Sequence, residues 1–141
     1  MIKLGIAGAI GKMGRRIIEL AQHDKDFEVT FALERRGIPE IGKELGKLKI
    51  SSNPDGMFLI DVFVDFTIPE ASEQLLDYVV RYKKGLVLGT TGLTDVQIQK
   101  VEEVSKVVPV VFSPNMSIGV NTLFQVLPDL AKKLGPDYSI E

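Results

Sequence analysis

The 141-residue sequence predicts an α/β fold in which a doubly wound parallel sheet carries helices on both faces. Short apolar segments with strand composition alternate along the chain with segments in which apolar residues recur at helical spacing. Such alternation is typical of parallel strands joined by right-handed helical crossovers. In addition, the segment 85–88 (Gly-Leu-Val-Leu) is apolar throughout, as expected for a strand covered on both faces.

The first half of the chain opens with a strand and a helix and contains two further strand-like segments. Its predicted segments are, in order, a buried strand at 2–7, a helix covering 15–21, a strand at 28–33, a loop at 37–49, a short edge strand at 50–52, a turn at 53–56 and one helical turn at 58–60.

The second half repeats the strand–helix alternation. Its predicted segments are a strand at 61–66, a helix beginning at Pro69, the strand at 85–88, a helix capped by Thr94, a strand at 107–112 with Pro109 at its start or edge, and a final helix beginning near Gly119. Pro128 falls inside that final helix and should kink or split it, because proline cannot donate a backbone hydrogen bond.

Composition narrows the class of protein and of partner. A chain of this length suggests one domain, and 45% hydrophobic with 26% charged residues is ordinary for a soluble globular protein. The net charge is −2 and the basic residues are scattered, so neither nucleic acid nor a membrane surface is an expected partner. No apolar run is long enough for a membrane span and no secretory leader is recognisable, so a cytoplasmic location is expected.

The sequence lacks the residues that metal sites and thiol chemistry usually require. The chain has no cysteine, which excludes disulfides, thiolate catalysis and zinc sites built on cysteine. A single histidine cannot form a histidine cluster, so no metal site is expected. His23 falls at the end of the first predicted helix, where a surface or capping role is expected.

Glycines separate the first strand from the first helix. Gly8, Gly11 and Gly14 form a G-x-x-G-x-x-G pattern, with Ile10 where the common dinucleotide fingerprint has its second glycine. The first amides of a helix lack partners and lie at the positive end of its dipole, so a pyrophosphate can bind there if no side chain blocks it. The pattern thus predicts a Rossmann-like dinucleotide site, although a purely structural turn would also use these glycines.

The second strand ends in charged residues at an informative distance. Glu34 stands 20 residues after Gly14, where a carboxylate could accept hydrogen bonds from both hydroxyls of a ribose. Arg35 and Arg36 follow, and a guanidinium there could bind a 2′-phosphate. The acid favours NAD and the arginines favour NADP, so either is compatible with this end. The alternative is a solvated charged cluster at a strand end.

Further polar segments follow the remaining strands. They are Thr-Ile-Pro at 67–69, Gly-Thr-Thr at 89–91 and Ser-Pro-Asn-Met-Ser at 113–117. In parallel sheets, ligands bind beyond the carboxyl ends of the strands, so these segments should converge with the glycine loop and Glu34. Gly89 would let backbone approach a flat ring, and the hydroxyls of Thr90 and Thr91 could bind a ribose or an amide.

A set of motifs, in this order, resembles the nucleotide-binding part of dihydrodipicolinate reductase (4-hydroxy-tetrahydrodipicolinate reductase). They are Gly-Ala-Ile-Gly-Lys-Met-Gly at 8–14, Ala-Leu-Glu-Arg at 32–35, Asp-Phe-Thr-Ile-Pro-Glu at 65–70, Gly-Thr-Thr-Gly at 89–92 and Asn-Met-Ser-Ile-Gly-Val-Asn at 115–121. The resemblance covers essentially the whole chain. It implies a cytoplasmic enzyme that reduces 4-hydroxy-tetrahydrodipicolinate, a cyclic dicarboxylate, to tetrahydrodipicolinate with NADH or NADPH in lysine and diaminopimelate biosynthesis.

The resemblance also implies roles for residues at the strand ends. Gly8, Ala9, Ile10, Gly11, Lys12 and Met13 would hold the pyrophosphate, Glu34 the adenosine ribose, and Arg35 with Lys12 the 2′-phosphate. Gly89, Thr90 and Thr91 would lie near the nicotinamide together with Thr67, and Ser113, Pro114, Asn115 and Met116 would close over it. Lys12 stands where the family usually has arginine, and Met116 where it usually has an aromatic residue.

The resemblance further implies a division of the chain into 1–134, the dinucleotide-binding domain, and 135–141, the start of a substrate and catalytic domain. The family's His-His-x-x-Lys motif and Ser-Gly-Thr loop do not occur in this sequence. No catalytic acid is therefore expected in this chain, which should bind cofactor without turning over alone.

The sequence leaves open the oligomeric state of this chain and two other interpretations of its function. The full-length family is expected to be homotetrameric through the part that is missing here, so the present chain could be a monomer. Two other interpretations remain: a stand-alone NAD(P)-binding sensor module, and a different Rossmann dehydrogenase related to homoserine or aspartate dehydrogenase. The segment 115–121 argues against the second of these.

Overall fold

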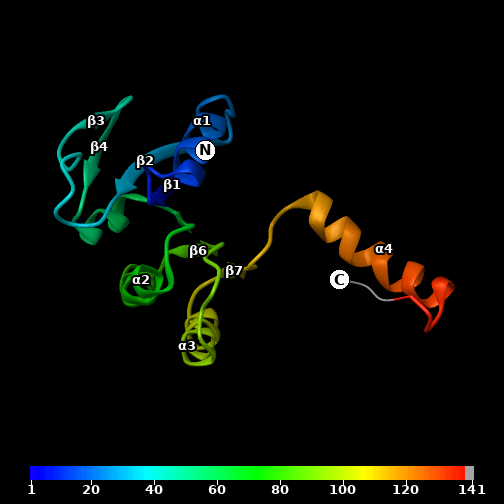
Figure 1. The fold of residues 1–141 in the computed structure, drawn as a ribbon. Coiled ribbons are helices and arrows are strands. Elements are labelled where there is room, and N and C mark those ends of the chain that lie inside the picture. The colour runs from blue at the N-terminus through cyan, green and yellow to red at the C-terminus, as the bar shows by residue number, and fades with distance from the viewer. Residues whose placement is uncertain (139–141) are drawn as a thin grey trace.

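A single sheet forms the centre of the computed structural model, which describes residues 1–138 (Figure 1). Within this range the strand order is β3-β4-β2-β1-β5-β6-β7. The strands are β1 (Ile2–Ala7), β2 (Phe27–Leu33), β3 (Glu44–Leu45), β4 (Leu48–Ser51), β5 (Val62–Asp65), β6 (Gly85–Leu88) and β7 (Val110–Phe112). All neighbouring pairs are parallel except β3 and β4.

The helices occupy the predicted connections between strands. They are α1 (Lys12–Gln22), the 3₁₀ helix η1 (Pro54–Leu59), α2 (Pro69–Tyr82), α3 (Asp95–Ser105) and α4 (Ile118–Leu134). The strand order reverses at β1, with β2 on one side and β5 on the other. This reversal confirms the doubly wound, Rossmann-like α/β fold that the sequence predicts.

Helices lie on both faces of the sheet, with α1 beside β1 and β2 (Figure 1). On one face, Ile18 of α1 packs against Ile6 and Ala32 of the two central strands. On the other face, α2 and α3 bury a larger cluster that includes Phe63 and Leu76. Burial of each large apolar side chain contributes about 2 kcal/mol to folding, so the two helix layers stabilise the sheet between them.

Helix α4 does not join either layer. It lies apart from the sheet beyond β7 (Figure 1), and none of its residues is buried. Leu123, Phe124 and Leu130 expose 58%, 60% and 46% of their surface, so an apolar side of the helix faces solvent. The helix runs through Pro128 without being split. Since α4 is solvent-exposed along its length, water can replace the hydrogen bond that proline cannot make.

Other differences from the sequence prediction have local causes. The loop predicted at 37–49 contains a hairpin, β3–β4, which turns at Gly46 with φ +63°. The two-residue strand β3 shows no periodicity, which is why the pattern missed it, whereas β4 overlaps the edge strand predicted at 50–52 and begins two residues earlier. The strand predicted at 107–112 begins only at Val110, because the amides of Val107 and Val108 bond to Val104 and continue the end of α3.

Smaller shifts affect two helical segments. Helix α1 begins at Lys12 rather than at 15, and the single turn predicted at 58–60 is the longer 3₁₀ helix η1. Among residues 1–138, no helix combines the length and the hydropathy that crossing a lipid bilayer requires.

Thr94 caps α3 as predicted, and its removal should lower stability. Its hydroxyl accepts from the Gln97 amide at 3.3 Å, and the Gln97 side chain accepts from the Thr94 amide at 3.0 Å. Thr94→Ala should reduce the free energy of unfolding by about 1 kcal/mol in urea denaturation. Thr94→Ser keeps the hydroxyl and should stay close to the wild type. Equal losses in both variants would contradict the capping role.

Candidate functional site

The central strands end together at one edge of the sheet. Ala7 of β1 is in register with Leu33 of β2 and Asp65 of β5, Asp65 with Leu88 of β6, and Leu88 with Phe112 of β7. The predicted site segments follow these residues: the glycine loop at 8–14, Glu34, Thr67, 89–91 and 113–117. The structure therefore brings the predicted site segments to a common edge, centred on the reversal of strand order.

Two glycines, Gly8 and Gly14, occupy positions at the junction of β1 and α1 that disfavour any larger residue. Gly8 has φ +65°, a left-handed conformation that favours glycine. A Cβ atom on Gly14 would lie 2.2 Å from the carbonyl oxygen of Gly8 and 2.8 Å from the Cα atom of Ala9. The predicted role of Gly14 in close helix packing thus has a direct structural basis, with Ala9 fully buried beside it.

The start of α1 is suited to an anion. Gly11 is the N-cap, no side chain caps this helix by a hydrogen bond, and its first turn carries no acidic residue. Lys12 and Met13 are exposed there. Unpaired amides, the positive end of the helix dipole and a lysine therefore fit a pyrophosphate group.

Glu34 points at the glycine loop. Its Oε1 atom accepts a hydrogen bond from the Ile10 amide at 2.9 Å, across 24 residues of sequence. On the other side of the same peptide segment, Nε of Arg15 donates to the Ile10 carbonyl at 2.7 Å. Ile10 is thus held from both sides. Arg15 was missed by the sequence analysis, because only its position in the helix, and not its reach back to the loop, can be read from the pattern.

Three basic residues next to these segments are solvent-exposed. Arg35 and Arg36 follow Glu34 directly, and Lys12 stands in the first turn of α1. Their exposure leaves them accessible to a phosphate.

Four polar side chains form a connected group beyond β5 and β6. Oγ1 of Thr67 donates to Oδ1 of Asp65 at 2.6 Å, and the Thr67 amide donates to the same oxygen at 2.9 Å. The Ser72 hydroxyl lies 3.4 Å from the Thr67 hydroxyl and 2.8 Å from that of Thr90. Asp65, Ser72 and Thr90 are each 1% exposed. The Thr90 side chain therefore faces inward, whereas Thr91 is exposed.

Gly89 makes room for an aromatic ring of the protein itself. A Cβ atom on Gly89 would lie 2.0 Å from a ring carbon of Phe66. Phe66 is half-buried and was missed as a site residue, because an aromatic residue at a strand end resembles ordinary core. The ring and the glycine backbone together shape the edge between β5 and β6.

The segment after β7 is folded by its own hydrogen bonds. Ser113 donates its hydroxyl to the Asn115 carbonyl at 2.8 Å, and the Asn115 side chain accepts from the Ser117 amide at 2.9 Å. The Asn121 side chain donates to the carbonyl oxygens of Asn115 and Ser117 at 3.1 and 2.9 Å. Pro114 and Met116 are exposed. This loop is thus tied to the first turn of α4 rather than to the glycine loop.

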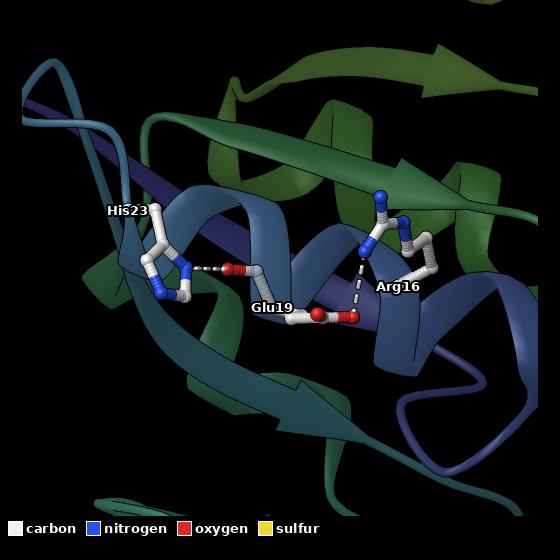
Figure 2. Close-up of polar contacts among 3 residues, drawn as sticks. All are labelled: Arg16, Glu19 and His23. Carbon is white, nitrogen blue, oxygen red and sulfur yellow. Dashed lines mark hydrogen bonds and ion pairs between the residues drawn. The ribbon is translucent and has the colours of Figure 1, made fainter.

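The single histidine lies at the opposite end of α1 from the glycine loop (Figure 2). Its Nδ1 atom is 2.8 Å from the Glu19 carbonyl, so Nδ1 carries the proton and donates. Glu19 also pairs with Arg16 at 2.9 Å. His23 is the C-cap residue of α1, as the sequence led us to expect.

A hollow of about 930 Å³ lies elsewhere on the molecule. It opens at the amino ends of the strands, between the end of α1, the start of β2 and the β3–β4 turn, with Gln22, Phe27 and Leu48 among its lining residues. It contains none of the predicted site residues. Ligands of open α/β sheets bind at the opposite edge, so this hollow is not the candidate site.

Comparison with known proteins gives consistent matches. Residues 2–116 match the family model described as "Dihydrodipicolinate reductase, N-terminus". Two curated proteins named 4-hydroxy-tetrahydrodipicolinate reductase, from Citrifermentans bemidjiense and Rubrobacter xylanophilus, are 37% and 40% identical over the whole chain. The chain covers 56% and 55% of their lengths, so it spans about half of the relatives it matches.

A solved structure shares the fold. The dipicolinate-bound dihydrodipicolinate reductase from Paenisporosarcina sp. TG-14 superposes with a TM-score of 0.73 at 22% identity. The match covers 89% of this chain and 52% of that one.

The contact between Gly14 and the Gly8 carbonyl predicts a strong effect of substitution. Gly14→Ala should lower the free energy of unfolding by roughly 1–3 kcal/mol, because backbone atoms must move to admit the methyl group. Gly119→Ala is the matched control, since the nearest atom to its Cβ position is 3.9 Å away. Urea denaturation should show little or no loss for the control. A neutral Gly14→Ala would show that the close packing does not constrain the loop.

Proposed function

The chain belongs to the dihydrodipicolinate reductase family as its N-terminal part, and we propose that its site binds NADH or NADPH. The observation that carries this proposal is the Glu34 carboxylate held against the glycine loop at the uncapped start of α1. That arrangement offers a hydroxyl acceptor and an anion site side by side, which are the two groups that an adenosine diphosphate moiety needs.

The dinucleotide would span the reversal of strand order. Its pyrophosphate would lie against the loop 8–13 and bind the first amides of α1, because the amides of residues 8–11 already donate to Leu33, Glu34 and Gly8. Its adenosine ribose would donate hydroxyl hydrogen bonds to Glu34. The nicotinamide end would then lie beyond β5, β6 and β7, on the other side of β1. The segments there are Thr67, Gly89-Thr90-Thr91 and Ser113-Pro114-Asn115-Met116. Because the Thr90 hydroxyl faces inward, we assign Thr90 a contact through its backbone and leave direct hydroxyl contact to Thr91.

The proposed activity of the whole protein is reduction of 4-hydroxy-tetrahydrodipicolinate to tetrahydrodipicolinate in lysine and diaminopimelate biosynthesis, in the cytoplasm. When bound, the reduced cofactor supplies the hydride. Two curated relatives with this name support the proposal, and a relative whose structure holds dipicolinate supports a cyclic dicarboxylate as the ligand class.

The division of labour within the full-length protein is also proposed. Residues 1–134 would supply the cofactor site, and 135–141 would begin the substrate domain; residues 139–141 of that boundary lie outside the described part. The general acid and the substrate carboxylate site would be carried by the part of the relatives that the match leaves uncovered. A homotetramer of the full-length protein, built through that part, belongs to the same proposal.

Replacing Glu34 tests the ribose assignment. In a fluorescence titration with NADH, Glu34→Gln should weaken binding about tenfold, since a charge-assisted acceptor becomes a neutral amide. Binding of NADPH should weaken less, because its 2′-position carries phosphate rather than a hydroxyl. If wild-type chain binds neither nucleotide saturably at millimolar concentrations, the cofactor proposal is wrong.

Replacing Arg35 should produce the opposite preference. Arg35→Ala should weaken NADPH about five- to tenfold and leave NADH almost unchanged, because only NADPH presents a phosphate to the guanidinium. Lys106→Ala is the charge-matched control, as Lys106 is exposed at the end of α3, remote from the sheet edge. If Glu34→Gln and Arg35→Ala each changed the affinities for NADH and NADPH by the same factor, the assignment of these two residues to the adenosine ribose and its 2′-phosphate would be contradicted.

A further inference from the structure

We propose that Ser72 and Asp65 are positioning residues for the nicotinamide end of the site. They act through one buried chain of hydrogen bonds, Thr90–Ser72–Thr67–Asp65, that fixes the backbone beyond β5 and β6. This inference rests on the proposed cofactor function and adds residues and a mechanism of ordering to it.

The chain adds a side-chain connection through α2 to the backbone pairing of β5 with β6, in which the Gly89 amide donates to the Asp65 carbonyl at 2.8 Å. Asp65 ends β5, Thr67 lies in the following loop, Ser72 belongs to the first turns of α2, and Thr90 lies in the loop after β6. Between Ser72 and Thr90 the hydrogen bond measures 2.8 Å and spans 18 residues of sequence. The side chains of the two loops are therefore connected through α2 as well as through the sheet.

The Thr67 hydroxyl donates to Oδ1 of Asp65 at 2.6 Å. Since its hydrogen is used there, Thr67 can only accept across the 3.4 Å that separates it from the Ser72 hydroxyl. Between Ser72 and Thr90 either hydroxyl can donate, and Thr90 is the donor when Ser72 donates to Thr67. In that arrangement the hydrogen of the Thr90 hydroxyl is used for Ser72. This is why we assign it an ordering role rather than a direct hydrogen bond to a ligand.

Because three of the four residues are buried, breaking a hydrogen bond of the chain is costly. Asp65, Ser72 and Thr90 are each 1% exposed, so solvent cannot replace a missing partner. A buried hydroxyl that loses its partner retains the full cost of desolvation. The loops are therefore held in the arrangement that satisfies all four groups.

The same chain reaches the pyrophosphate loop. The Cγ2 methyl of Thr67 lies 3.0 Å from the position that a Cβ atom would take on Gly8. Thr67 is thus the member of the chain that lies against the turn after β1. Ordering by Ser72 and Asp65 is expected to act on the nicotinamide side of that turn, because Glu34 and Arg15 hold the adenosine side independently.

The test compares a whole dinucleotide with its adenosine half. Ser72→Ala and Thr90→Val each break the chain while keeping most of the volume, and Thr90→Ser keeps the hydroxyl. We expect NADH affinity, followed by nicotinamide fluorescence, to fall about fivefold in Ser72→Ala and Thr90→Val. The fluorescence change of bound NADH should also shrink. ADP affinity, measured by calorimetry, should remain within about twofold of wild type.

The double variant adds a second criterion. If both residues act through one chain, Ser72→Ala combined with Thr90→Val should weaken NADH no more than either change alone. Thr90→Ser should restore wild-type NADH binding, which a purely volume-based effect would not do. Should Ser72→Ala fail to fold, the Thr90→Val and Thr90→Ser pair carries the same comparison.

The contradicting outcomes are separable. Unchanged NADH affinity in Thr90→Val, with lower stability alone, would show that the chain serves folding and would overturn the inference while leaving the proposed function intact. Equal losses for NADH and ADP would overturn the assignment to the nicotinamide end. Wild-type chain that binds neither NADH nor ADP would overturn the proposed function and this inference with it.

Discussion

Close contact between the turn after β1 and the start of α1 determines where everything else at this edge can lie. With only 2.2 Å between the Gly8 carbonyl and the position of a Gly14 Cβ, the helix must begin immediately beside the strand end. Its first amides consequently open onto the carboxyl edge of the sheet, where the strands on either side also end. Glu34 reaches the Ile10 amide across this short turn, at 2.9 Å.

Much of this arrangement could be predicted because it follows from periodicity and from glycine. Strand and helix patterns placed five polar segments after five strands, and parallel pairing aligned those ends. The Ser72 contribution could not be predicted, since a serine on the apolar side of a helix resembles any small core residue and its partner lies 18 positions away. Strand β3 was missed because two residues are too short for a pattern, whereas β4 overlaps the edge strand predicted at 50–52. The ligand contacts of Glu34 and Arg35 stay predictions.

Helix α4 shows that a sequence pattern can predict a helix without predicting what the helix packs against. The spacing of its apolar residues correctly predicts a helix with one apolar side, but it does not indicate which surface covers that side. Leu123, Phe124 and Leu130 remain exposed, whereas the equivalent faces of α1, α2 and α3 are buried on the sheet. A helix of this length is marginally stable without packing, so covering its apolar side would stabilise it.

The nicotinamide side of the proposed site is held by buried hydrogen bonds, whereas the adenosine side is held by the half-buried Glu34 carboxylate. This difference affects how each side would bind a ligand. Beyond β5 and β6 the polar groups are buried and mutually satisfied, so a ligand there meets a surface whose order does not depend on it. At the adenosine side, Glu34 is half-buried and uses one oxygen for Ile10. A carboxylate offers about four lone-pair sites, so ribose hydroxyls can be accepted without releasing the loop. Binding at this end therefore adds hydrogen bonds to an existing contact and need not break it first.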